Sequence, residues 1–168
     1  MKYCAVDLDG VLTAYPEEWL KFLDGFSHKF STLDGSKALL SYNEYSELKR
    51  RWRVSPAKRY MATRSGACGF MQELRRRGYS VIVTTSRPVD EHPHLVAWTA
   101  QWLQANNMPY CELLFNRYRP LMVLERHPDV EFVVNDEEER LDVPYSCDTM
   151  RFHFTAEKGF KWILEAIE

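Results

Sequence analysis

The sequence predicts an α/β fold of the Rossmann-like kind, in which a parallel sheet lies between two layers of helices. Three short apolar runs carry this prediction, Tyr3–Val6, Tyr79–Val83 and Glu131–Val134. Each run ends abruptly in polar residues, and each is typical of a strand that is buried on both faces. Segments with apolar residues at helical spacing separate the runs, and such strand–helix alternation favours a parallel sheet of three-layer type.

Size and composition indicate a folded chain in a reducing compartment. The 168 residues are typical of one domain with a small insert, and 45% hydrophobic residues are enough for a full core. A net charge of −2 is too small to indicate electrostatic attraction of the whole protein to nucleic acid or to a membrane surface. The cysteines are widely spaced and form no Cys-x-x-Cys pair, which favours a cytoplasmic protein. A strand that begins at Tyr3 leaves no room for a signal peptide, and no apolar run is long enough to span a membrane.

The first strand ends in two carboxylates two residues apart, Asp7 and Asp9, and Gly10 follows them. Ligands collect beyond the carboxyl ends of the strands in open α/β sheets. If the chain stays extended, both side chains point the same way. Two carboxylates at such a short distance repel each other unless a cation separates them. Oxygen ligands of this kind suit Mg²⁺.

The run from Asp7 to Thr13 resembles the first motif of the haloacid dehalogenase (HAD) superfamily, Asp-x-Asp-Gly-[Val/Thr]-Leu. The resemblance implies that Asp7 is a nucleophile that takes a phosphoryl group, and that Asp9 acts as general acid and then as base. It also implies that Mg²⁺ sits on Asp7 and on the backbone carbonyl of Asp9. An acidic turn without chemistry is the alternative.

Residues 13–65 do not look like the next strand–helix unit. Apolar spacing predicts one helix over Tyr15–Phe26 and another over Leu39–Trp52. In HAD proteins a C1 cap is inserted at this point, so the resemblance implies a core of residues 1–12 and 66–168 and a small helical C1 cap of residues 13–65. Caps close over a site and exclude water. An ordinary helical excursion of the fold is the alternative.

The second half of this insert is strongly basic. Seven lysines and arginines and no acidic residue lie between Lys49 and Arg64, with Trp52 and Tyr60 among them. Cations interleaved with aromatic rings suit a phosphorylated ligand that carries a base, either a nucleotide or a nucleic-acid strand. A solvated helix face offset by neighbouring glutamates is the other interpretation.

The second strand runs into Thr84, Thr85, Ser86 and Arg87. A hydroxyl at this position can donate a hydrogen bond to a phosphoryl oxygen without adding charge. The segment resembles the second HAD motif, which favours Thr85 over Thr84 as the phosphate contact, with Ser86 as a further contact. A longer pattern follows: Thr85-x-Arg87-Pro88, then Thr99-x-x-Trp102-Leu103, then Met108-Pro109-Tyr110 and a strand. This pattern resembles the 5′(3′)-deoxyribonucleotidase-like branch of the superfamily, which implies a nucleotide substrate.

The third HAD motif is usually a lysine, but the sequence has none between Lys58 and Lys158. A third strand is expected over Tyr110–Phe115, and Arg117 and Arg119 follow it directly. Arginine can also hold a phosphoryl group, so one of these two is the expected replacement. Supply of the cation by the insert stays open.

The fourth strand ends in Asn135 and Asp136, which resembles the fourth HAD motif. The resemblance implies that Asp136 binds Mg²⁺, with Glu137 or Glu139 orienting metal-bound water. The uncharged Asn135 replaces a usual acidic residue or glycine. A fifth strand within Cys147–Phe154 and a helix over Thr155–Ile167 complete the expected core.

Together the motifs imply a Mg²⁺-dependent phosphomonoester hydrolase that works through an aspartyl-phosphate. Its substrate is expected to be a small phosphorylated molecule, and a 5′-nucleotidase-like activity on nucleotides is favoured. A polynucleotide 3′-phosphatase is the first alternative, with the Lys49–Arg64 segment as the strand contact. A non-catalytic HAD-like binding module is the second, because of the missing lysine and Asn135. The sequence leaves the oligomeric state open.

Overall fold

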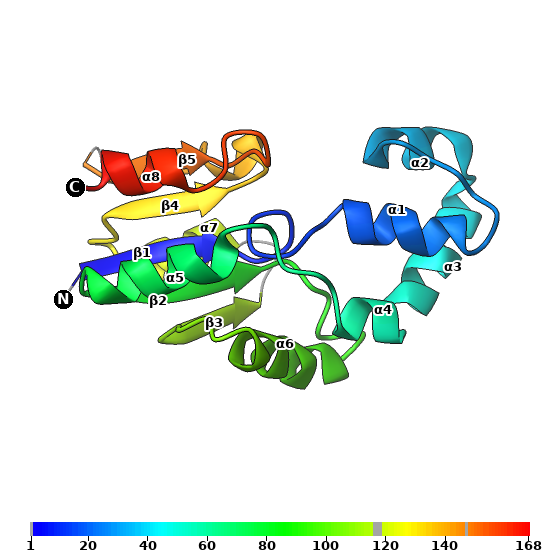
Figure 1. Ribbon diagram of the computed structural model, residues 1–168, viewed down its shortest axis with the longest axis horizontal. Helices are drawn as coiled ribbons and strands as arrows, with labels where there is room; N and C mark the ends of the chain where they lie inside the picture. Colours follow the sequence, from blue (N-terminus) through cyan, green and yellow to red (C-terminus); the bar gives the residue numbers. More distant parts are fainter. Residues whose placement is uncertain (1, 116–118, 147) are drawn as a thin grey trace.

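The computed structural model describes residues 2–115, 119–146 and 148–168 of the chain. Its centre is a parallel sheet of five strands in the order β3-β2-β1-β4-β5 (Figure 1). The strands are β1 (Lys2–Asp7), β2 (Tyr79–Thr85), β3 (Glu112–Phe115), β4 (Phe132–Asn135) and β5 (Met150–His153). The predicted strands are therefore present, with ends shifted by at most three residues.

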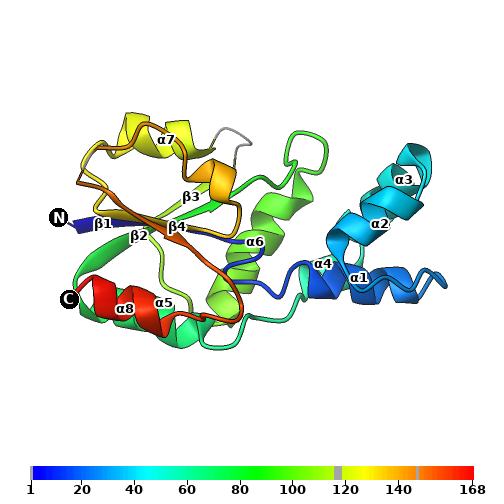
Figure 2. The same ribbon diagram turned by 90° about the horizontal axis from the view of Figure 1, so that it is seen from above.

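Helices cover both faces of the sheet, which confirms the predicted three-layer fold (Figure 2). On one face, α5 (Ala67–Arg76), α6 (His94–Ala105) and α8 (Lys161–Ala166) pack over Val6 and Val81. On the other face, α7 (Arg119–Arg126) packs over Ala5, Ile82 and Val133. Successive strand residues alternate between these two cores, as the twofold period of a strand requires.

The chain between β1 and α5 forms four helices with a core of their own. They are α1 (Glu17–Asp24), α2 (Leu33–Leu39), α3 (Tyr42–Arg53) and α4 (Pro56–Arg59). Trp19, Leu23, Leu48, Trp52 and Met61 form the buried cluster that holds them together. Both views show these helices set beyond the carboxyl ends of the strands (Figures 1 and 2). We call residues 13–65 the helical insert, and its boundaries stay a prediction.

Two helix predictions need correction. The helix expected over Leu39–Trp52 begins only at Tyr42, because Ser41 forms a capping box with Glu44 and starts a new helix there. The helix expected over Thr155–Ile167 begins only at Lys161, since Gly159 with φ of +64° interrupts the backbone before it. Helices α2, α4 and α7 were not expected individually from the sequence.

The structure bears on two further predictions, the lack of a membrane span and the free cysteine thiols. No helix in the described part of the chain is both long and apolar enough to cross a membrane. The cysteines Cys4, Cys68 and Cys111 carry free thiols, as the sequence led us to expect, while Cys147 lies outside the described residues. The cytoplasmic location stays a prediction.

Candidate functional site

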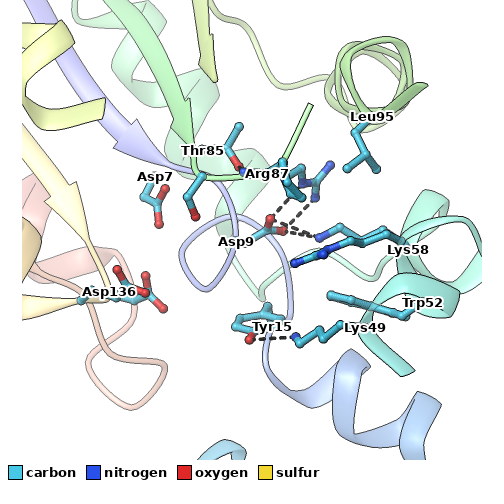
Figure 3. Close-up of a pocket in the computed structure, with 14 residues that line it drawn as sticks. Asp7, Asp9, Tyr15, Lys49, Trp52, Lys58, Thr85, Arg87, Leu95 and Asp136 are labelled. Atoms are coloured by element: carbon cyan, nitrogen blue, oxygen red, sulfur yellow. Dashed lines mark hydrogen bonds and ion pairs between the residues drawn. The ribbon is translucent and has the colours of Figure 1, made fainter. Parts of the chain in front are cut away.

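The carboxyl ends of β1, β2 and β4 face the helical insert across a cavity of about 150 Å³ (Figure 3). The sheet side of the lining includes Asp7, Asp9, Thr85, Ser86, Arg87 and Asp136. The insert contributes Tyr15, Lys49, Trp52, Arg53 and Lys58. Five of the predicted site residues, Asp7, Asp9, Thr85, Ser86 and Asp136, are therefore brought together.

Asp7 and Thr85 are the last residues of the adjacent strands β1 and β2. They are 2% and 1% exposed, so the backbone holds both side chains firmly at the base of the cavity. Thr84 lies on the opposite face of β2, beside Ala5 and Val123. Strand alternation thus puts Thr85, and not Thr84, in the cavity. The Thr85 hydroxyl oxygen accepts a hydrogen bond from the Arg87 backbone N–H at 3.2 Å, which fixes its direction.

The chain turns immediately after Asp7, so it does not stay extended through Asp9, which was the condition for both side chains to point the same way. The backbone N–H groups of Leu12 and Thr13 both donate to the Leu8 carbonyl, at 2.9 and 3.0 Å. Gly10 has φ of +100°, and a Cβ atom there would overlap the carboxylate of Asp136. Only glycine therefore allows this turn and the close approach of Asp136 together.

The Asp9 carboxylate is held by cations from both sides of the cavity. Arg87 donates from Nε and Nη2 to the two Asp9 oxygens at 2.8 and 2.7 Å. Lys58 Nζ lies 3.2 Å from Oδ2. Burial alone would raise the pKa of Asp9, but the charges of Arg87 and Lys58 outweigh it and hold this pKa well below its usual range.

Lys58 shares this environment. Its pKa falls to about 7, because burial and the nearby Arg87 disfavour the ammonium form more strongly than Asp9 favours it. It comes from α4, at the edge of the insert that faces Asp9 (Figure 3). This contact fits the possibility that the insert supplies a cation to the site.

Asp136 follows β4 and lines the cavity opposite the insert. The side chain of Asn135 is buried and accepts the Glu137 backbone N–H at 2.9 Å, so this residue shapes the loop. His153 Nε2 donates to the Asp136 carbonyl at 3.0 Å. Glu137 also lines the cavity, whereas Glu139 is exposed and is not part of its lining.

The donor set fits Mg²⁺. Asp7 and Asp136 bring two carboxylates to one cavity, and Mg²⁺ is usually bound by one or two carboxylates together with water. The Asp9 carboxylate is engaged by Arg87 and Lys58, so its backbone carbonyl is the group left for a metal. Within the described residues, no cluster of three or more His, Cys, Asp or Glu side chains forms a metal site.

The two predicted phosphate-binding arginines are not placed by the structure. Arg117 lies outside the described residues, and Arg119 begins α7 but its side chain is also outside the description. Arg126, a third cation in this region, bonds to Glu112 and is not part of the cavity lining. Their assignment stays a prediction.

The basic segment Lys49–Arg64 does not form one surface. Arg50 and Arg51 are exposed and pair with Glu47, and Arg64 pairs with Glu17. Lys49, Arg53 and Lys58 instead line the cavity. The interpretation as a solvated helix face therefore holds for Arg50 and Arg51, while Lys49, Arg53 and Lys58 face the site.

Sequence reasoning gave no site role to two of the residues that line the cavity, Tyr15 and Arg87, and it named Lys49 and Trp52 only as members of the basic segment Lys49–Arg64. Arg87 follows the phosphate-site threonine by two residues, a spacing that could have identified it. No local pattern identifies Lys49 and Tyr15, which lie far apart in the chain and meet at 3.2 Å.

A comparison of the sequence with models of known protein families finds no match, and neither does a comparison with curated proteins. Solved structures do match. A HAD-superfamily hydrolase from Ehrlichia chaffeensis is 12% identical, with a TM-score of 0.55 over 99% of this chain and 97% of that one. The fold is that of HAD hydrolases. A predicted phosphoglycolate phosphatase from Haemophilus somnus is 13% identical, with a TM-score of 0.57 over 100% of this chain and 98% of that one.

A third structural neighbour comes from a Pnkp1/Rnl/Hen1 complex. It is 19% identical, with a TM-score of 0.55 over 91% of this chain and 45% of that one. At these identities the three neighbours establish the fold shared with HAD hydrolases. The narrower resemblance to the deoxyribonucleotidase-like branch stays a prediction.

Proposed function

We propose that the protein is a Mg²⁺-dependent phosphomonoester hydrolase in which Asp7 is the nucleophile. One observation carries the proposal: Asp7 and Thr85 end two adjacent strands, Asp136 directly follows the next strand, β4, and all three line one cavity. The turn at Gly10 places Asp9 in the same cavity. Two carboxylates for a metal, a hydroxyl for a phosphoryl oxygen and a third carboxylate near the reacting bond are the groups that such chemistry needs. The HAD hydrolase fold supports the proposal.

The reaction would proceed in two displacements on phosphorus. The Asp7 carboxylate attacks the phosphoryl group in line, the bond to the leaving oxygen breaks, and an aspartyl-phosphate forms. Thr85 donates a hydrogen bond to a phosphoryl oxygen, and Ser86 lies beside it for a second contact. When bound by Asp7 and Asp136, Mg²⁺ would offset negative charge on the phosphoryl oxygens.

Asp9 would move the protons. It gives a proton to the leaving oxygen in the first displacement and takes one from water in the second. The ion pairs with Arg87 and Lys58 favour its ionised form, which is the form needed to accept a proton. We expect a bound phosphate dianion to draw on the same cations and raise the pKa of Asp9, which favours the form needed to donate.

A nucleotide is the substrate that we favour. The insert wall of the cavity combines the Trp52 and Tyr15 rings with Lys49, Arg53 and Lys58, which suits a base-bearing phosphate. A 5′-nucleotidase-like activity is the first choice. The terminal phosphate of a polynucleotide is the second choice, which the likeness to a chain of the Pnkp1/Rnl/Hen1 complex favours.

Phosphate release tests the proposal. The protein is assayed with Mg²⁺ and with EDTA on nucleoside 5′- and 3′-monophosphates, sugar phosphates and a 3′-phosphorylated oligonucleotide. We expect release that EDTA abolishes, and the best substrate distinguishes the nucleotidase from the polynucleotide phosphatase. No release from any compound by a protein that still binds Mg²⁺ would favour the non-catalytic module instead.

A further inference from the structure

The cavity has a second group of cations that the proposed chemistry does not use. Lys49 belongs to α3, and its side chain lines the cavity on the insert side (Figure 3). The residue is 9% exposed, so its ammonium is almost fully removed from water. Within residues 2–115, 119–146 and 148–168, no carboxylate forms an ion pair with it. A buried cation without a counter-charge is costly unless a ligand supplies the charge.

Aromatic rings hold the Lys49 ammonium in place. Its Nζ lies 4.0 Å from the ring centre of Trp19, 4.6 Å from that of Trp52 and 4.8 Å from that of Tyr15. It also donates a hydrogen bond to the Tyr15 hydroxyl at 3.2 Å. Contacts of this kind orient a cation and lower the cost of burying it, but they do not neutralise its charge. Lys49 is therefore fixed in the cavity wall. Burial and the neighbouring Lys58 lower its pKa, and an anion bound beside it would favour the ammonium form again.

Arg53 lies one helical turn after Lys49 on α3 and lines the same cavity. In the part of the chain that the structure describes, its guanidinium has no ion-pair partner either. Residues four apart on a helix share a face, so the two cations form one wall. Lys58 and Arg87 differ from them, because both are already bonded to Asp9.

Among the described residues, the carboxylates that line the cavity form no ion pair with Lys49 or Arg53. Asp9 forms ion pairs with Arg87 and Lys58. Glu137 pairs with Arg140, which is not part of the cavity lining. Asp7 and Asp136 lie on the sheet side, where Mg²⁺ and the phosphate to be hydrolysed would bind. The α3 wall thus carries the Arg53 guanidinium and a Lys49 amine whose protonation a bound anion would favour, and it lies on the insert side of the cavity, across from Asp7 and Asp136.

We propose that Lys49 and Arg53 bind a second phosphate of the substrate, on the leaving-group side of the phosphate that Asp7 attacks. The inference rests on the proposed function, since that function defines which phosphate is the first. The substrate class is then a nucleotide with two separate phosphates. The second is either a terminal monoester, as in a nucleoside 3′,5′-bisphosphate, or the phosphodiester next to the end of an oligonucleotide.

Substrate pairs that differ by one phosphate test the inference. The value of kcat/KM is measured for a nucleoside 3′-monophosphate, a 5′-monophosphate, the 3′,5′-bisphosphate and a dinucleotide that carries a 3′-phosphate. We expect a two-phosphate compound to be preferred over its monophosphate by about tenfold or more, the size of one charge-assisted hydrogen bond. A preference for the 3′,5′-bisphosphate would identify the second phosphate as a terminal monoester. A preference for the dinucleotide would identify it as a phosphodiester.

Variants then tie the preference to the α3 wall. Lys49→Met keeps the length of the side chain without its charge, and we expect it to lower the preference about tenfold; Arg53→Met is a second variant that does not depend on the first one folding. Arg51→Met is the matched control, because Arg51 is an exposed cation of the same helix that does not line the cavity. It is expected to keep the wild-type preference.

The outcomes separate the inference from the proposed function. Release at equal kcat/KM with and without the second phosphate, or a preference that neither Lys49→Met nor Arg53→Met lowers, overturns the inference and leaves the hydrolase intact. If no compound releases phosphate, isothermal titration measures binding of the same compounds. If the two-phosphate compounds bind more tightly than the monophosphates, and Lys49→Met abolishes this difference, the inference is supported without the hydrolase. If there is no such difference in binding, both the inference and the proposed function are overturned.

Discussion

Arg87 holds Asp9 through two parallel hydrogen bonds, Nε to Oδ2 at 2.8 Å and Nη2 to Oδ1 at 2.7 Å. The guanidinium is itself fixed, because its Nη1 donates to the Thr99 hydroxyl at 2.7 Å and the residue is 7% exposed. Bidentate pairs of this kind combine charge with a defined direction. Arg87 therefore sets the orientation of the residue that we assign to proton transfer.

Arg87→Lys is expected to reduce kcat by about ten- to a hundredfold, because lysine keeps the charge but cannot form both bonds. KM for the phosphomonoester is expected to change less than kcat. The measurement is steady-state kinetics together with the pH profile of kcat. A variant with a normal kcat and pH profile but a lower melting temperature would show that Arg87 serves stability alone.

Gly10→Ala is expected to weaken Mg²⁺ binding by about tenfold or more, since a Cβ at this position would displace the Asp136 carboxylate. The backbone strain of a positive φ adds about 1–2 kcal/mol to the cost of folding. Isothermal titration with Mg²⁺ gives the affinity, and urea unfolding gives the stability.

Gly78→Ala is the control for that strain. Gly78 has φ of +84°, but no atom lies within 4 Å of the place of its Cβ. This variant is expected to lose a similar amount of stability and to bind Mg²⁺ as the wild type does. Equal Mg²⁺ affinity in the two variants would contradict the role given to Asp136.

Lys49 is expected to make stability depend on pH. Burial and the neighbouring Lys58 and Arg53 lower its pKa from 10.5 to about 6 in the folded protein. Between these values the unfolded chain binds a proton that the folded chain has lost, so the free energy of unfolding rises with pH. The aromatic rings around Nζ act in the opposite direction and reduce the slope.

Urea unfolding at about pH 6.5 and about pH 8.5 tests this dependence. The wild type is expected to gain more stability over this interval than Lys49→Met does. Lys21→Met removes an exposed lysine of the same insert that is not among the charges acting on Lys49, and it serves as the control. A gain as large in Lys49→Met as in the wild type would show that Lys49 keeps its proton when the protein folds.

The sheet-side half of the site could be predicted because its chemistry is local. Asp7, Thr85 and Asp136 stand at the ends of apolar runs, and parallel strands bring such ends to one edge of the sheet. A tight turn at Gly10 is what a glycine allows, but the close approach of Asp136 to it was not predicted, because it joins residues more than a hundred positions apart.

The insert-side half could not be predicted for a related reason. Lys49 and Lys58 reach the cavity because Trp19 and Trp52 pack the insert helices against one another, and no spacing rule reports such packing. The same tertiary packing separates the basic segment into exposed pairs and cavity-lining cations. Composition alone could identify this segment but not divide it.

The most direct measurement is phosphate release by Asp7→Asn with Mg²⁺ on the best wild-type substrate, beside Asp34→Asn as an exposed control. Near-ultraviolet circular dichroism establishes that each variant is folded. Because an amide oxygen is a poor nucleophile, Asp7→Asn is expected to lose turnover while Asp34→Asn keeps it. Wild-type turnover by a folded Asp7→Asn protein would contradict the assignment of Asp7 as the nucleophile.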